Sequence, residues 1–168
     1  MTLPASVEGS ERLRLFCALR LPDQATVKLA SWQDEAFGNL PDVRPSPRDH
    51  LHVTLAFLGH RPAGELEQIL GALRDASRSA EPAVLALRNY RETRSVGMLT
   101  FDDEDGRAAA LAADLHGRLA ALGVYEPERR KWLPHVTVLR FRRRPRLRPA
   151  LPELPPFELL LERLHPAI

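Results

Sequence analysis

The run His-Val-Thr-aliphatic occurs twice in the chain, as HVTL at positions 52–55 and as HVTV at positions 135–138. In a β-strand, residues i and i+2 project to the same face of the sheet. His52 and Thr54 therefore share one face, as do His135 and Thr137, while the aliphatic residues point toward a core. Each run predicts an imidazole and a hydroxyl side by side on an otherwise apolar strand.

The repetition of this run is the first reason to assign it a function. A random chain with the same six histidines and six threonines would contain only roughly 0.2 His-x-Thr triplets. One such triplet would be explained well by a histidine packed in a core. Two of them, each in a strand context, favour two imidazoles and two hydroxyls that meet at one site.

Two imidazoles and two hydroxyls are suited to displacement at phosphorus. Imidazoles with pKa values of about 6.5 can be held in opposite protonation states at neutral pH, one as general base and one as general acid. A displacement at phosphorus uses both, because the nucleophile enters opposite the departing oxygen. Threonine hydroxyls can donate hydrogen bonds to the other phosphate oxygens. This chemistry requires neither a metal nor a cofactor.

Metal binding is the competing use of these histidines. His50 and His52 are two apart on the same strand, and His60 is nearby. Zinc sites use three or four His, Cys or carboxylate ligands, but Cys17 is the only cysteine and belongs to an apolar run. The position equivalent to His50 before the second run is Leu133. The pattern therefore favours phosphate chemistry over a metal site.

An arginine-rich segment directly follows the second run. Nine of the 24 cationic residues lie between positions 129 and 148. A solvated surface loop and a channel that guides a polyanion to the site are both compatible with this segment. Its members are Arg129, Arg130 and Lys131 before the second run and Arg140, Arg142, Arg143, Arg144, Arg146 and Arg148 after its start.

The elements that position these residues can be predicted from periodicity and from turn residues. Asp23 is expected to N-cap the first helix, and Gly123 is expected to end the third. The predicted strands cover 13–21, 51–59, 83–90, 96–101, 135–141 and 157–164, and the predicted helices cover 23–37, the stripe 66–73 and 106–122.

The two halves of the chain repeat one plan. Phe16 precedes His52 by 36 residues, and Leu99 precedes His135 by 36 residues. Each interval holds a strand, a helix, a polar loop and the strand with the repeated run. We therefore expect a duplicated unit, with two lobes related by a pseudo-two-fold axis within one domain over residues 1–168.

Composition places few limits on function. The chain has 168 residues, of which 44 % are hydrophobic, a net charge of +2 and a pI near 9.1, which permits binding to nucleic acid without requiring it. A single cysteine excludes an internal disulfide and fits a reducing compartment. No stretch approaches a membrane span. We expect a cytoplasmic monomer that does not interact with membranes.

The segments RLFCALRLP, LHVTLAFLG, LAALG and PHVTVLR together resemble the two-histidine phosphoesterases, and most closely their RNA 2′,3′-cyclic phosphodiesterases, also called 2′-5′ RNA ligases. The resemblance covers roughly residues 12–141. It implies a bilobal α+β fold in which antiparallel sheets line a central cleft and helices lie outside. It also implies that the substrate is RNA or a nucleotide with a 2′,3′-cyclic phosphate.

The resemblance further assigns a role to each site residue. His52 would protonate the leaving 3′ oxygen, His135 would activate water, and Thr54 and Thr137 would hold the phosphate. Arg140 would contact phosphate or the 5′ side of the substrate, although strand alternation turns it away from His135 unless a bulge or the strand's end re-aims it. Phe57 holds the place equivalent to Arg140 after His52 and is expected to pack.

Two questions stay open from the sequence. The motifs are nearly symmetric, so they do not decide which histidine is the acid and which is the base. The chain could also be a non-catalytic RNA- or phosphate-binding module that retains the site without turnover. A binder has no need of two titratable groups, and this favours the hydrolase, which could also join RNA ends through a 2′-5′ bond.

Overall fold

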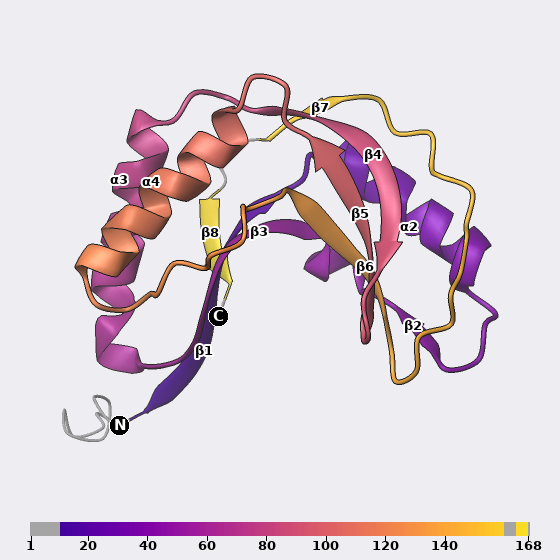
Figure 1. The fold of residues 1–168 in the computed structure, drawn as a ribbon, viewed down its shortest axis with the longest axis horizontal. Coiled ribbons are helices and arrows are strands. Elements are labelled where there is room, and N and C mark those ends of the chain that lie inside the picture. Colours follow the sequence, from indigo (N-terminus) through magenta and orange to yellow (C-terminus); the bar gives the residue numbers. More distant parts are fainter. Residues whose placement is uncertain (1–10, 160–163, 168) are drawn as a thin grey trace.

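The computed structural model describes residues 11–159 and 164–167, the latter by their backbone, and has an α+β fold (Figure 1). Two short 3₁₀ helices lie at Arg48–His50 and Ala63–Glu65. The other elements are β1 (Arg12–Arg20), α2 (Asp23–Phe37), β2 (Val43–Pro45), β3 (His52–Pro62), α3 (Leu66–Ser79), β4 (Val84–Glu92), β5 (Val96–Asp102), α4 (Arg107–Ala121), β6 (His135–Phe141), β7 (Phe157–Glu158) and β8 (Leu164–Ala167).

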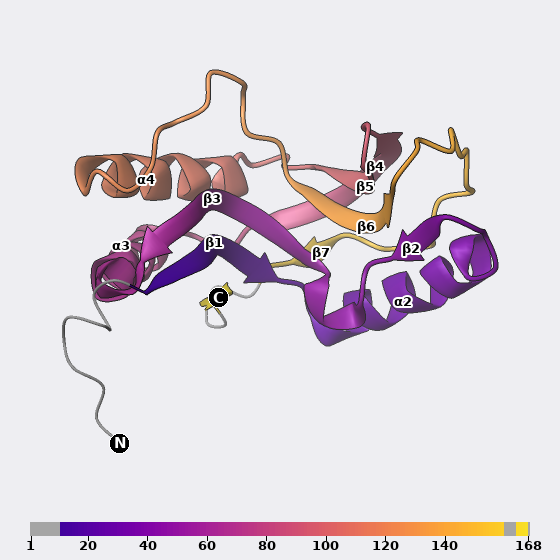
Figure 2. The same ribbon diagram turned by 90° about the horizontal axis from the view of Figure 1, so that it is seen from below.

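The strands form two antiparallel sheets. One has the order β3-β1-β8 and the other the order β2-β6-β5-β4-β7. Together they form an arch, with α3 and α4 at one end and α2 at the other (Figure 1). The view from below shows α2 beside β2 and β6, while α3 and α4 flank β1 and β3 (Figure 2). This arrangement confirms the expected pair of antiparallel sheets with helices outside them.

Both halves of the chain have the predicted order of strand, helix and strand, but the helix of each unit packs beside a strand of the other unit. The first unit is β1-α2-β3 and the second is β5-α4-β6, and in each unit the two strands pair antiparallel. However, α2 packs against β2, beside the second unit's β6, and α4 packs against the first unit's β3. The two equal 36-residue intervals do not join equivalent positions, because Phe16 pairs with Phe57 and Leu99 pairs with Val136, while the residues paired with His52 and His135 are Arg20 and Thr100. The two units therefore differ in loop length.

The helices bury the apolar faces that their periodicity predicts. Ala108, Leu111, Ala112, Leu115 and Leu119 of α4 are all buried. Leu122 is 39 % exposed because the helix ends at Ala121. Gly123 follows with φ of 75°, a left-handed conformation that glycine adopts without strain.

Two sequence predictions need correction. Pro22, and not Asp23, is the N-cap of α2, and Asp23 is the first helical residue, where its carboxylate is favoured by the helix dipole. The single strand expected over 157–164 is instead divided. β7 pairs with β4 and β8 pairs with β1, so the two ends of this segment join different sheets. Residues 160–163 lie outside the described residues.

Candidate active site

The structure brings the two repeated runs together. β3 is the outer strand of the three-stranded sheet, and it contacts β6 of the other sheet. His52, Thr54, His135 and Thr137 are all half-buried, and the residues that alternate with them are buried. The contact between β3 and β6 therefore brings the two runs, each with a half-buried imidazole and hydroxyl, beside each other.

A β-bulge interrupts the first run at its aliphatic residue. Cys17 pairs with Ala56 and Ala18 pairs with Thr54, which leaves Leu55 without a partner on β1. A bulge of this kind puts two residues of one strand opposite one residue of the other and shifts the alternation of faces.

The second run has the same bulge at the same position. Gly97 pairs with Leu139 and Met98 pairs with Thr137, which leaves Val138 unpaired. A Cβ on Gly97 would lie 2.8 Å from a Leu139 methyl carbon, closer than side chains pack. Only glycine therefore fits beside the bulge.

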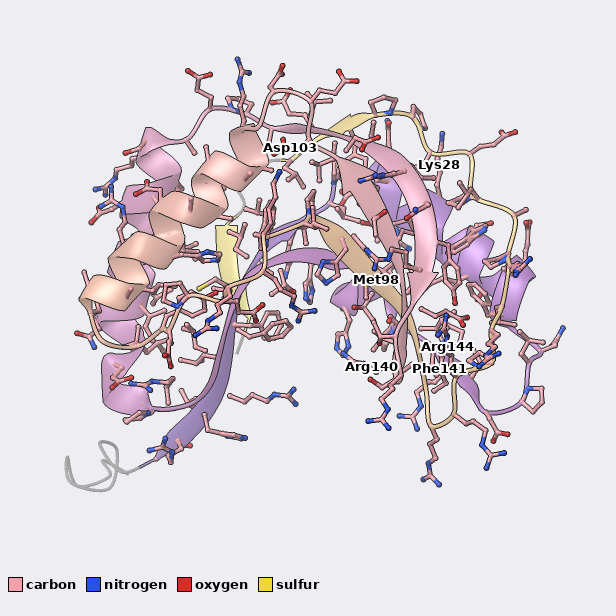
Figure 3. All side chains as sticks on the ribbon, viewed as in Figure 1. Lys28, Met98, Asp103, Arg140, Phe141 and Arg144 are labelled. Atoms are coloured by element: carbon pink, nitrogen blue, oxygen red, sulfur yellow. The ribbon has the colours of Figure 1, made fainter. Side chains whose placement is uncertain are left out.

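The bulge re-aims Arg140, which is one of the two ways that the sequence analysis left open. Val138 and Leu139 are both buried, and Arg140 is exposed on the face that carries His135. Figure 3 shows Arg140 and Phe141 on opposite sides of the strand. Arg140 is therefore turned toward the same side of the sheet as the second histidine.

Phe57 is turned outward in the same way after the first bulge. Its side chain is 61 % exposed, and its ring centroid lies 5.8 Å from that of Phe16. Phe57 therefore packs on Phe16, while most of its surface stays exposed.

Each bulge carbonyl accepts a hydrogen bond from a helix of the other unit. The His116 Nε2–H of α4 donates to Leu55 O at 2.6 Å. The Gln33 side chain of α2 donates to Val138 O at 2.7 Å, and the Ser46 backbone N–H donates to the same oxygen at 2.9 Å. Sequence analysis missed Gln33 and His116, which read as ordinary polar residues of amphipathic helices.

A hydrogen bond fixes the tautomer of His135. Nδ1 lies 3.0 Å from the backbone oxygen of Leu133. A carbonyl oxygen can only accept, so Nδ1 carries the proton and donates it. In the neutral ring, Nε2 is then unprotonated and available as a base.

His52 lies in a different environment. Its ring stacks on Phe16 with a centroid separation of 5.0 Å. Burial, and then the charges of His50 and His135, lower the pKa of His52 from 6.5 to about 4. In the free protein His52 is therefore neutral at neutral pH.

A further contact joins the two runs. Trp132 Nε1–H, in the loop before the second run, donates to the backbone oxygen of Thr54 at 3.1 Å. Within residues 11–159, the side-chain hydroxyls of Thr54 and Thr137 make no hydrogen bond. Both hydroxyls are therefore free to donate to a bound anion.

Comparison with known sequences places this geometry in a family. Residues 21–166 match the family described as the 2′-5′ RNA ligase superfamily. The chain belongs to this superfamily. The match extends into the C-terminal segment, beyond the residues that carry the resemblance in the sequence.

Curated relatives within the superfamily carry one name. A protein of Escherichia coli strain K12, named RNA 2′,3′-cyclic phosphodiesterase, is 34 % identical over 136 residues, covering 78 % of this chain and 73 % of that protein. A Geobacillus stearothermophilus protein of the same name is 25 % identical over 142 residues, covering 77 % of this chain. The chain spans only 42 % of the Geobacillus protein's length.

Several solved structures share the fold. The structure of E. coli LigT complexed with 3′-AMP aligns with a TM-score of 0.73 at 27 % identity, covering 89 % of this chain and 84 % of that one. A Thermus thermophilus protein, TT0787, aligns with a TM-score of 0.71 at 25 % identity, covering 88 % of this chain and 84 % of that one.

Other chemistry-bearing residues near the site complete its description. Among the described residues, no group of three or more His, Cys, Asp or Glu could hold a metal ion, and no helix could span a membrane.

Cys17 is buried, and burial raises the pKa of its thiol to about 11, so it is not a reactive thiolate. Arg20, which sequence analysis also missed, is exposed and paired directly opposite His52.

Proposed function

We propose that this protein hydrolyses the 2′,3′-cyclic phosphate ends of RNA to 2′-phosphomonoesters by metal-independent acid–base catalysis. One observation carries the proposal: the contacting strands β3 and β6 each carry a half-buried imidazole and a half-buried hydroxyl from the repeated run. The names of the curated relatives support the same substrate class.

The two histidines take opposite roles in the reaction. Nε2 of His135 accepts a proton from water, and the water oxygen forms a bond to phosphorus. The bond from phosphorus to the 3′ oxygen breaks, and that oxygen takes the proton of His52. The hydroxyls of Thr54 and Thr137 stabilise the charge on the remaining phosphate oxygens, and the guanidinium of Arg140 contacts the 5′ side of the substrate.

Substrate binding supplies the proton that His52 needs for its role. In the free protein the lowered pKa keeps His52 neutral. A phosphate anion beside the ring favours the imidazolium and raises this pKa, which converts His52 into an acid. The base role of His135 is supported by its Nδ1–H bond to Leu133 O.

The same site accounts for 2′-5′ ligation. A 5′-hydroxyl that replaces the attacking water would bond to the phosphorus while the 3′ oxygen leaves. The product is then a 2′-5′ phosphodiester, and the reaction is the reverse of cleavage of that bond.

The test is incubation of the protein with a nucleoside 2′,3′-cyclic phosphate in EDTA, with the product identified by phosphorus NMR. We expect turnover to the 2′-phosphate. A 3′-phosphate would contradict the assigned leaving oxygen. Binding without turnover would favour the non-catalytic module, and turnover only after metal addition would favour a metal-dependent site.

A further inference from the structure

An open hollow of about 480 Å³ lies at the end of β6, beyond the second run. Its lining includes Arg44 on the edge strand β2, Arg140 near the end of β6, and Arg142 just after β6. Asp42 is the one carboxylate in the lining. The hollow therefore carries an excess of positive charge.

Among the described residues, the arginines of this hollow have no ion-pair partner, although Asp42 shares its lining. Arg44 and Arg140 are directly opposite each other in the antiparallel pairing of β2 with β6, and like charges in that arrangement repel. Within residues 11–159, the guanidinium groups of Arg44, Arg140 and Arg142 make no hydrogen bond or ion pair. An anion between them would remove the repulsion.

The segment that follows the hollow is fixed to the sheet by a buried carboxylate. The side chain of Glu92 is 3 % exposed and pairs with Arg144 at 3.3 Å. It also accepts hydrogen bonds from the Leu147 N–H at 2.9 Å and from the Tyr90 hydroxyl at 2.7 Å. Arg144 is therefore used for anchoring (Figure 3), whereas Arg140 and Arg142 remain available.

We propose that the hollow of Arg44, Arg140 and Arg142 binds a backbone phosphate of single-stranded RNA, on the 5′ side of the cyclic end. This inference rests on the proposed function and names its substrate as an oligonucleotide. Arg140 lies on the same strand face as His135, about 15 Å along the strand. A mononucleotide cannot span this distance, whereas about two to three nucleotides of extended chain can.

The kinetic test compares two substrates. One is a nucleoside 2′,3′-cyclic phosphate, and the other is a single-stranded RNA of about six nucleotides with the same end. For Arg44→Ala and Arg142→Ala we expect kcat/KM on the RNA to fall about five- to tenfold, with the mononucleotide changed less than about twofold. Arg148→Ala, which removes a charge from the same segment outside the hollow, is the control and should leave the ratio of the two substrates unchanged.

Three kinetic results would overturn the inference: equal loss on both substrates, equal loss in Arg148→Ala, or no preference for RNA in the unmodified protein. Failure of the proposed function looks different, because then neither substrate is turned over. In that case, a measurement of RNA binding tests whether the hollow binds a phosphate.

The binding test measures the anisotropy of a fluorescein-labelled RNA that ends in a 2′-phosphate. The slope of log Kd against log salt should fall by about 0.7 in Arg44→Ala and stay the same in Arg148→Ala. An acidic peptide of equal charge should compete weakly. Equal competition would mean that the hollow recognises acidic protein segments, and an unchanged slope in Arg44→Ala would exclude a phosphate contact.

Discussion

Leu55 and Val138 occupy the same place in the two halves of the molecule: each is the unpaired residue of a β-bulge and follows its motif histidine by three positions. Each carbonyl is held by a side chain from the other unit's helix, His116 for Leu55 and Gln33 for Val138. The exchanged helices thus fix the shape of each strand just before the point where the residue two positions later, Phe57 or Arg140, turns outward.

The two bulge carbonyls differ in how they respond to loss of the helix donor. Val138 O keeps the Ser46 N–H, whereas Leu55 O loses the side-chain bond from α4. An unsatisfied buried carbonyl costs about 1–3 kcal/mol. We therefore expect His116→Phe to lower kcat about tenfold with a smaller change in KM, while His116→Gln, which retains a donor, stays near the unmodified rate. Equal rates for the two variants would remove the positioning role.

His52 should titrate far from the usual histidine range. Its imidazole signal in NMR is expected to have a midpoint near pH 4 in the free protein. Inorganic phosphate should raise this midpoint by about one to two units, since an adjacent anion stabilises the imidazolium. A midpoint near 6.5 that phosphate does not move would contradict the assigned environment.

The same shift predicts how stability depends on pH. The pKa of His52 is lower in the folded protein than the value of about 6.5 expected in the unfolded chain. The unfolded chain therefore binds more protons between pH 4 and 6.5, and the free energy of unfolding decreases as the pH falls through this window. His52→Asn, compared with the unmodified protein by urea unfolding, should flatten this part of the profile.

The Glu92 carboxylate should contribute to folding stability and to the preference for RNA substrates, and not to the rate of phosphate hydrolysis itself. Burial raises the pKa of Glu92, but hydrogen bonds from Tyr90, Leu147 and Arg144 outweigh burial and lower it overall. Glu92→Gln should lower the free energy of unfolding by about 1–3 kcal/mol above the ordinary carboxylate pKa. The variant should keep mononucleotide turnover and lose part of the preference for RNA. Unchanged stability in urea unfolding would contradict the anchoring role.

The sequence predicts the motif strands and the helices well, because β-branched alternation and apolar stripes are local signals. It also indicates a bulge or a strand end before Arg140, since alternation alone would bury that charge. The exchange of helices between the units is a long-range packing choice, so neither it nor the roles of Gln33 and His116 can be read from local pattern. The exposure of Phe57 could not be predicted, because no charged residue follows the first bulge to indicate that the strand changes face there.

The most direct measurement of the central claim is the rate of cyclic phosphate hydrolysis in EDTA by His52→Ala, His135→Ala and the double variant. If both rings act on one phosphorus atom, each single variant should lose at least about a hundredfold in kcat/KM. The double variant should then be little slower than either single one, because the pair acts as a unit. A single variant that keeps near-unmodified turnover, or losses that multiply fully in the double variant, would contradict a shared site.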